Sequence, residues 1–90
     1  MRPQIEYKAS VEKDLRRLGR PASTLVLKRL ETALVERGIE GEPLMGEFAG
    51  LYRLRVGDYR VIYARTEKGY LVLRIGHRRE VYRRGQPPSS

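Results

Sequence analysis

Three strand-like stretches follow one another in the C-terminal half of this 90-residue chain, and turn-sized segments separate them. They are LYRLRV (51–56), DYRVIYAR (58–65) and YLVLRIG (70–76). The pair Gly57-Asp58 and the segment EKG at Glu67–Gly69 have the length and residue types of hairpin turns. The pattern therefore predicts an antiparallel three-strand meander.

Two helical patterns precede these strands. In the first, Val11, Leu15 and Leu18 form one apolar stripe, Ser10 is the expected N-cap, and Gly19 ends the helix. The second begins at Pro21 and ends at Gly38. Its apolar face is made of Val26, Leu27, Leu30, Ala33 and Leu34. The two patterns predict a helical hairpin.

An N-terminal strand and a glycine-rich connection complete the expected fold. Ile5 and Tyr7 alternate with polar residues, which is typical of a short edge strand. Residues 38–50 are expected to connect the second helix to the first strand of the meander. Within this connection, Leu44, Met45 and Phe48 are expected to cover the rim of the core. We therefore predict an α+β domain over residues 1–85, with the helices packed on one face of the sheet, and a disordered tail at 86–90.

Composition limits the chemistry and favours a polyanionic partner. The 19 Lys and Arg residues exceed the 11 Asp and Glu residues, giving a net charge of +8, which suits nucleic acid, an anionic membrane surface or an acidic protein segment. The chain has no cysteine and only one histidine, His77, so no metal ion or other cofactor is expected. Without the apolar run of a signal peptide or a membrane span, the expected location is the cytoplasm.

Strand alternation predicts where the cations gather. In LYRLRV, Arg53 and Arg55 share the face opposite to the helices, and in the next strand Arg60 shares a partly apolar face with Ile62 and is expected to be half-buried. Such cations also occur on surface strands to block edge pairing, and Glu47 or Glu80 could balance them. Because like charges on neighbouring strands repel, the cluster nevertheless indicates an anionic ligand.

The stretch LYRLRVGDYRVIY followed by IGHRREVYRR resembles the RelE/ParE superfamily of toxins from type II toxin–antitoxin systems, and the RelE branch most closely. The likeness covers nearly the whole chain, including KASVEKDLRRL and PLMGEFAGLYRLR. It implies a small α+β toxin whose concave sheet face enters the ribosomal A site and cleaves messenger RNA there. It also implies a cognate antitoxin that wraps the toxin in a hetero-oligomer.

The resemblance also implies which residues act. Functional positions of RelE-like toxins match Arg53 and Arg55, where the best-known members typically carry lysines, and further match Arg60, Arg78 and Tyr82. Arginine stays protonated, so Arg53 and Arg55 are better suited to clamp phosphate than to act as bases. The neighbouring Arg79 and Arg83 complete the set expected to bind RNA or the ribosome.

Roles within the expected site follow from side-chain chemistry. Arg60 and Arg78 suit bidentate contacts to phosphate. Tyr82 could stack on a base or donate a hydrogen bond, or else pack over the end of the sheet. His77 has the one side chain that naturally exchanges protons near neutral pH, and its alternative role is a structural hydrogen bond.

These features predict a ribosome-dependent endoribonuclease that cleaves messenger RNA by attack of a ribose 2′-OH on the phosphodiester. The main alternative is a ParE-like inhibitor of DNA gyrase without nuclease activity. A further alternative is a basic nucleic-acid-binding domain with weak or lost catalysis, because both lysine positions carry arginine. In either toxin branch the expected partner is an antitoxin with an acidic helical or extended segment.

Overall fold

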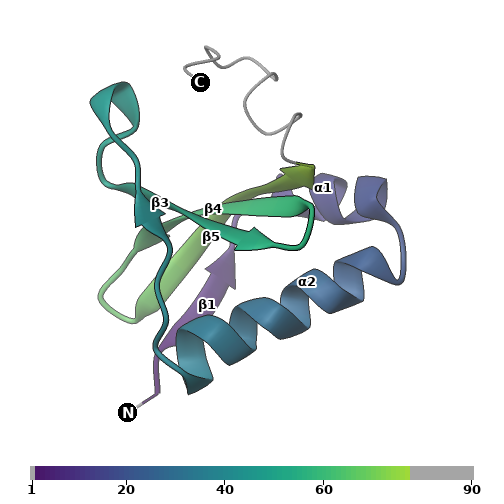
Figure 1. Cartoon of the computed structure of the whole chain (residues 1–90), viewed down its shortest axis with the longest axis horizontal. Coiled ribbons are helices and arrows are strands. Elements are labelled where there is room, and N and C mark those ends of the chain that lie inside the picture. The colour runs from purple at the N-terminus through teal and green to yellow at the C-terminus, as the bar shows by residue number, and fades with distance from the viewer. Residues whose placement is uncertain (1, 78–90) are drawn as a thin grey trace.

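The computed structural model describes residues 2–77, which form a mixed α+β fold with two helices and a five-stranded sheet (Figure 1). In chain order the elements are β1 (Gln4–Tyr7), α1 (Val11–Leu18), α2 (Ala22–Leu30), η1 (Glu31–Glu36), β2 (Glu42–Pro43), η2 (Gly46–Phe48), β3 (Leu51–Val56), β4 (Tyr59–Arg65) and β5 (Gly69–His77). Here η1 is a π-helical continuation of α2, and η2 is a single 3₁₀ turn. The tail predicted at 86–90 lies outside the described residues.

The strands are ordered β1-β5-β4-β3-β2. The antiparallel meander of β3, β4 and β5 is confirmed, and β3 has the predicted bounds. The N-terminal strand β1 lies at one edge of the sheet, where it pairs in parallel with β5. The fifth strand, β2, was not predicted: the expected connection contributes two residues that pair antiparallel with β3 at the other edge.

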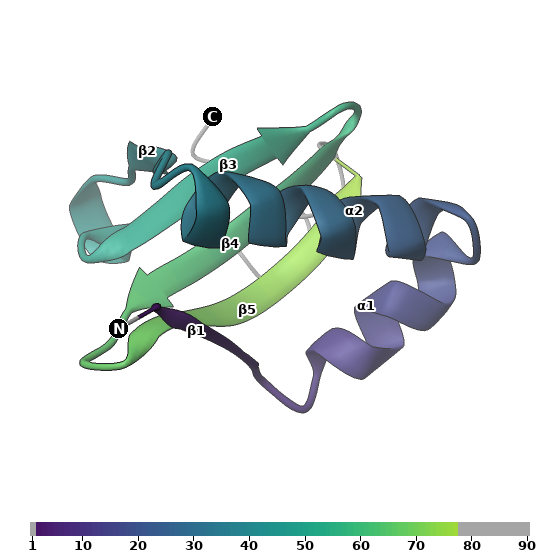
Figure 2. The ribbon, with the colours of Figure 1, turned by 90° about the horizontal axis from the view of Figure 1, so that it is seen from below.

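One hydrophobic core lies between the helices and one face of the sheet, and α2 crosses this face in Figure 2. Both helices bury side chains in it, together with η1. The fully buried residues are Val11, Val26, Leu30 and Leu34 from the helical segments, and Val61, Tyr63, Val72 and Ile75 from β4 and β5. The opposite face of the sheet is therefore left uncovered by these helices, and we call it the open face.

The helices begin and end close to their predicted bounds. Ser10 stands at the N-cap of α1, but its side chain makes no capping hydrogen bond because Ser10 is itself helical in conformation. Gly38, with a φ of 66°, ends the second helix, and the Ile39 N–H donates to the Ala33 carbonyl across this end. Within residues 2–77, neither helix is long and apolar enough to cross a membrane.

A bulge interrupts the pairing of β4 with β5. Tyr63 pairs with Val72, whereas the preceding residue Ile62 pairs with Arg74, so Leu73 is an extra residue on β5. This extra residue lets Val72 and Ile75, three positions apart, both point into the core. Because of the extra residue, the β5 residues after Leu73 point to the face opposite to the one that strict alternation along the strand predicts.

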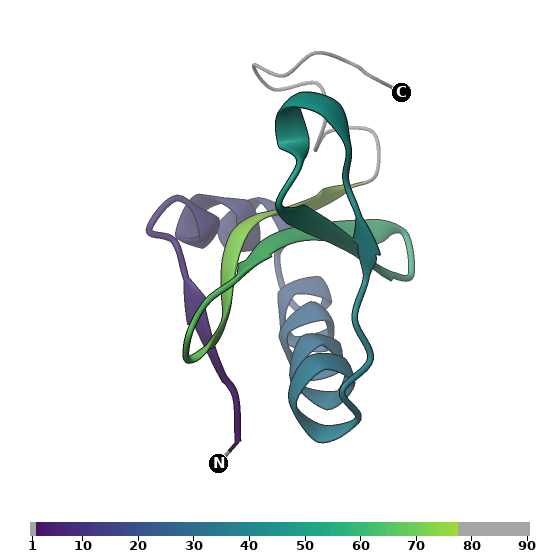
Figure 3. The ribbon, with the colours of Figure 1, turned by 90° about the vertical axis from the view of Figure 1, so that its left-hand side faces the viewer.

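The segment between β2 and β3 differs from its predicted packing. Leu44 and Phe48 are half-buried, but Met45 is 82% exposed, so the prediction that it covers the core rim was wrong. The reason is visible in Figure 3, where the loop that carries η2 stands out from the sheet on the side away from α2. A residue in this loop cannot reach the core on the helical side.

Candidate nucleic-acid interface

Arg55 and Arg60 are direct cross-strand partners on the open face. The two-residue turn Gly57-Asp58 joins their strands, and the φ of 59° at Gly57 is the left-handed value that a type II′ turn needs at its first central position. Arg55 is exposed, and Arg60 is half-buried as the sequence predicted. The tight turn thus holds two arginine residues directly opposite each other on neighbouring strands.

Arg53 lies on the same face, two cross-strand pairs further from the turn. It pairs with Ile62 on β4, and Ile62 in turn pairs with Arg74 on β5. The Arg53 side chain is 25% exposed. The structure therefore brings Arg53, Arg55 and Arg60 together as the sequence predicted, around a buried isoleucine. We call these three residues the arginine cluster.

Glu42 brings a carboxylate to the arginine cluster. It pairs with Arg53 across β2 and β3, and Arg53 Nη2 donates to Glu42 Oε1 at 2.7 Å. The hydrogen bond from Arg53 lowers the pKa of Glu42, with the charges of Arg53, Arg55 and Arg60 acting in the same direction. The sequence had suggested Glu47 and Glu80 as balancing charges. Glu47 lies exposed on η2, and Glu80 is outside the described residues.

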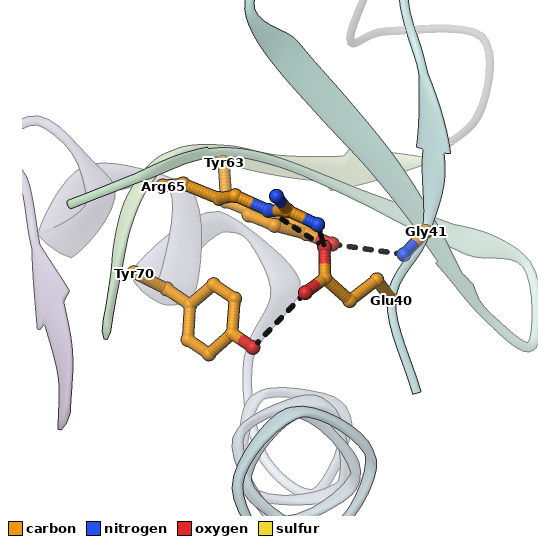
Figure 4. A network of polar contacts seen from close by, with 5 residues as sticks. All are labelled: Glu40, Gly41, Tyr63, Arg65 and Tyr70. Carbon is orange, nitrogen blue, oxygen red and sulfur yellow. Dashed lines mark hydrogen bonds and ion pairs between the residues drawn. The ribbon is translucent and has the colours of Figure 1, made fainter. Parts of the chain in front are cut away.

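A polar network holds the chain that leads into β2 (Figure 4). Arg65 donates from Nε at 2.9 Å and from Nη2 to Glu40 Oε1, and the Tyr70 hydroxyl donates to Glu40 Oε2 at 3.5 Å. The Gly41 N–H donates to the Tyr63 hydroxyl at 2.8 Å. Since Arg65, Tyr70 and Tyr63 belong to β4 and β5, this network ties residues 40–41 to the centre of the sheet.

Gly41 also allows β2 to approach β3 closely. A Cβ atom at this position would lie 2.1 Å from the Arg53 carbonyl oxygen and 2.6 Å from its carbon. Only glycine fits such an approach of one backbone to another. Glycine at 41 is therefore a requirement for Glu42 to reach Arg53.

Arg74 and Asp14 form an arrangement that sequence analysis missed. Asp14 of α1 is 6% exposed, and its Oδ2 accepts the Ile75 N–H at 3.0 Å and lies 3.6 Å from Arg74 Nε. The Asp14 carboxylate thus accepts a hydrogen bond from a β5 amide that lies beyond the end of β1, where no strand pairs with this edge of β5. Strict alternation from Val72 places Arg74 on the core side, so only the bulge brings it beside Ile62.

His77 does not share a face with Arg60 in the described structure. It pairs with Tyr59, whose side chain packs against the core, and the two rings meet edge to face with centroids 6.1 Å apart. Arg60 pairs instead with Gly76. This placement favours the structural alternative for His77 over proton transfer.

Four of the predicted site residues, Arg78, Arg79, Tyr82 and Arg83, lie outside the described residues, and their roles stay predictions. Among residues 2–77, no three His, Asp or Glu side chains gather closely enough to hold a metal ion. The arginine cluster itself offers fixed cations that can face an anion.

Comparison with protein families gives a match that covers most of the chain. Residues 5–82 match the family described as ParE toxin of the type II toxin–antitoxin system parDE. Toxin RelG of Mycobacterium tuberculosis is 39% identical over 46 residues, which are 49% of this chain and 53% of that toxin. The matched segment thus spans about half the length of this curated relative.

Solved structures with the same fold include a chain of the toxin–antitoxin complex RelBE2 from Mycobacterium tuberculosis. It has a TM-score of 0.77 at 24% identity, with 86% of this chain and 99% of that chain covered. A histidine-to-glutamine mutant of YafQ from Escherichia coli has a TM-score of 0.69 at 25% identity, covering 89% and 98% of the two chains. Both likenesses extend over nearly the whole of the solved chains.

Proposed function

Because the chain belongs to the ParE toxin family of type II toxin–antitoxin systems, we propose that it is the toxin of such a pair and that it cleaves messenger RNA on the ribosome. The fold shared with RelBE2 and YafQ supports the first part. The arginine cluster on the open face supports the second, together with the sequence resemblance to the RelE branch.

The pairing of Arg55 with Arg60 is the observation that carries this proposal. Like charges directly opposite each other on antiparallel strands destabilise the sheet. An RNA phosphate between the two guanidinium groups replaces this repulsion with charge-assisted hydrogen bonds. A fold that keeps such a pair on its open face is suited to a phosphate ligand.

Cleavage requires a ribose 2′-oxygen to attack the adjacent phosphorus while the bond from phosphorus to the 5′-oxygen breaks. The proton leaves the 2′-OH, and a proton must reach the departing 5′-oxygen. Arg55 and Arg60 supply fixed positive charge for the phosphorane oxygens, a contribution that is typically large in enzymes. The resemblance to the RelE branch adds two residues to the proposed site. Arg78 is a further contact to phosphate, and Tyr82 stacks on a base of the codon or donates a hydrogen bond to it.

Cleavage is proposed to depend on the ribosome because the arginine cluster does not by itself align the reacting atoms of the RNA. Cations bind the RNA backbone without aligning the 2′-oxygen with phosphorus and the leaving oxygen. A codon held by the ribosome is fixed in space, and such orientation is worth several kcal/mol towards a displacement reaction. Free RNA is accordingly proposed to be a poor substrate.

An antitoxin is the proposed protein partner. The chain has a net charge of +8, and Tyr7 on β1 and Leu25 on α2 are large apolar residues exposed on its surface. An acidic segment that folds on binding can cover such a surface and neutralise its charge. The complex is proposed to be a hetero-oligomer, as the RelBE2 toxin–antitoxin complex is.

The test adds purified toxin to ribosomes that hold a defined messenger and maps the cuts by primer extension. The wild type is compared with an Arg78→Ala, Tyr82→Phe double variant, and with Arg29→Gln as a control on the exposed surface of α2. We expect cuts inside the A-site codon with the wild type and the control, and none with the double variant. An intact messenger with the wild type contradicts the proposal.

Inhibition of DNA gyrase is the second candidate function, because the matching family is that of ParE toxins. A supercoiling assay with purified gyrase separates the two functions. Loss of supercoiling together with an intact messenger on ribosomes would establish the gyrase function. Supercoiling that continues at micromolar toxin would exclude it.

A further inference from the structure

Glu42 places a carboxylate oxygen against one arginine of the arginine cluster. Its Oε1 accepts from Arg53 Nη2 at 2.7 Å, a length typical of a charge-assisted hydrogen bond. The Glu42 side chain is 69% exposed, while that of Arg53 is 25% exposed. Solvent and ligands therefore reach the carboxylate more easily than the arginine that it holds.

This contact is built into the backbone of the fold. Glu42 and Arg53 are register partners, and the close approach of Gly41 to the Arg53 carbonyl keeps β2 against β3. The residues before β2 are fixed in turn by the bonds of Glu40 to Arg65 and of Gly41 to Tyr63 (Figure 4). The Glu42 carboxylate is thus held beside Arg53 because residues 40–41, which lead into β2, are bonded to β4.

The charge of Glu42 is matched to the whole cluster. The charges of Arg55 and Arg60 lower the pKa of this carboxylate, in the same direction as the larger effect of Arg53. An anion in this place offsets part of the repulsion between the three guanidinium groups. An RNA phosphate carries the same charge and bonds to arginine with the same geometry, so the two anions compete.

We propose that Glu42 is an internal anion of the RNA site, which holds Arg53 in the free toxin and yields it to a backbone phosphate when RNA binds. This inference rests on the proposed function, because it takes RNA to be the ligand of the open face. It assigns to Glu42 a role that limits affinity: each binding event must first release the carboxylate from Arg53.

Binding is measured without cleavage, by fluorescence anisotropy of a labelled 2′-O-methyl RNA oligonucleotide, at low and at physiological salt. The variants are Glu42→Gln, Arg53→Gln and the double variant. Glu67→Gln, on the exposed turn between β4 and β5, removes the same charge away from β2 and serves as the control. Thermal unfolding of each variant confirms that it is folded, and Glu42→Ala provides a second removal of the carboxylate.

We expect Glu42→Gln to bind the RNA roughly threefold to tenfold more tightly than the wild type, because a competing anion is removed. The gain should be smaller when Arg53 is glutamine, since the hydrogen bond between residues 42 and 53 is then absent and only the weaker effect of Glu42 on Arg55 and Arg60 is left. Weaker or unchanged binding by Glu42→Gln and Glu42→Ala overturns the inference, as does an equal gain in Glu67→Gln. Absence of binding by every variant, including the wild type at low salt, overturns the inference, whereas the proposed function fails only if the messenger stays intact on ribosomes.

Discussion

Arg55 on β3 and Arg60 on β4 face each other across the sheet, with only the pair Val56–Tyr59 between them and the Gly57-Asp58 turn. The turn leaves the two strands little freedom to shift relative to each other. The two cations cannot separate by sliding of the strands, so their repulsion persists in the free protein. The two charges therefore lower the stability of the fold, and the same two charges favour the binding of RNA.

Replacement of Arg60 by glutamine tests that opposition. We expect Arg60→Gln to raise the free energy of unfolding by about 0.2–1 kcal/mol, because a like-charge pair is removed. We also expect cleavage on ribosomes to fall about 100-fold or more, the usual effect of losing one group that stabilises transition-state charge. Urea denaturation and primer extension measure the two effects. The matched variant Arg29→Gln, on the exposed side of α2, should change neither.

Replacement of His77 separates its two possible roles. Since His77 pairs with Tyr59 and not with Arg60, we expect His77→Gln to keep cleavage within about threefold of the wild type and to lose about 0.5–1.5 kcal/mol of stability, the usual worth of an aromatic pair. The measurement is the rate of cleavage between pH 5 and 8, beside thermal unfolding. If the variant loses an ionisation that the wild-type profile shows, His77 instead transfers a proton.

Local pattern was enough to predict the parts of the fold that depend on neighbours in sequence. The bounds of β3, the short turn after it and the half-burial of Arg60 all follow from alternation and turn chemistry. In contrast, β2 has two residues, too few for an alternating pattern, and it forms because Gly41 lets the chain approach β3. Glu42 could not be assigned to the arginine cluster without that pairing.

The bulge at Leu73 explains the remaining differences. In YLVLRIGH, strict alternation from Tyr70 places Val72 and Arg74 on one face of the sheet. The same alternation places His77 on the opposite face. The extra residue on β5 places Arg74 on the open face and His77 beside Tyr59. Only the packing of both Val72 and Ile75 against the helices requires the bulge, and that packing is a property of the whole domain.

Asp14 is expected to be the carboxylate on which the fold depends most. Asp14→Ala removes the acceptor of the Ile75 N–H and leaves Arg74 without this partner, so we expect a loss of about 1–3 kcal/mol in the free energy of unfolding. Asp14→Asn keeps an acceptor oxygen and should lose less. Urea denaturation of both variants measures the difference. Equal losses would show that the charge, and not the hydrogen bond to β5, is what stabilises this edge.

Alkaline pH should weaken the fold through its buried tyrosines. Burial raises the pKa of Tyr63, partly opposed by the hydrogen bond from Gly41, and burial also raises the pKa of Tyr70. An unfolded tyrosine loses its proton near pH 10, before the folded one does. The stabilising contribution is therefore complete below about pH 10 and is lost as the pH rises through the folded pKa values.

Tyr63→Phe provides the check on this pH dependence. The variant removes the ionisable group and leaves the Gly41 N–H without its acceptor, so we expect it to be less stable at pH 8 by about 1–2 kcal/mol. Its stability should also fall less steeply than that of the wild type between pH 9.5 and 11. Urea denaturation at each pH measures both quantities. A wild type and a variant that lose stability in parallel would assign the alkaline loss to other groups.

Gly41→Ala tests whether β2 is what brings Glu42 to the arginine cluster. The added Cβ would lie 2.1 Å from the Arg53 carbonyl oxygen, so the backbone of residues 41–43 has to move away from β3 and Glu42 has to leave Arg53. We expect amide chemical shifts to change at Gly41, Glu42 and residues 52–54 while those of α1 stay unchanged. Because the internal anion is then displaced, this variant should bind RNA more tightly, as Glu42→Gln should. Unchanged shifts at 52–54, or affinity equal to that of the wild type despite the displaced strand, would contradict the connection between Gly41 and the RNA site.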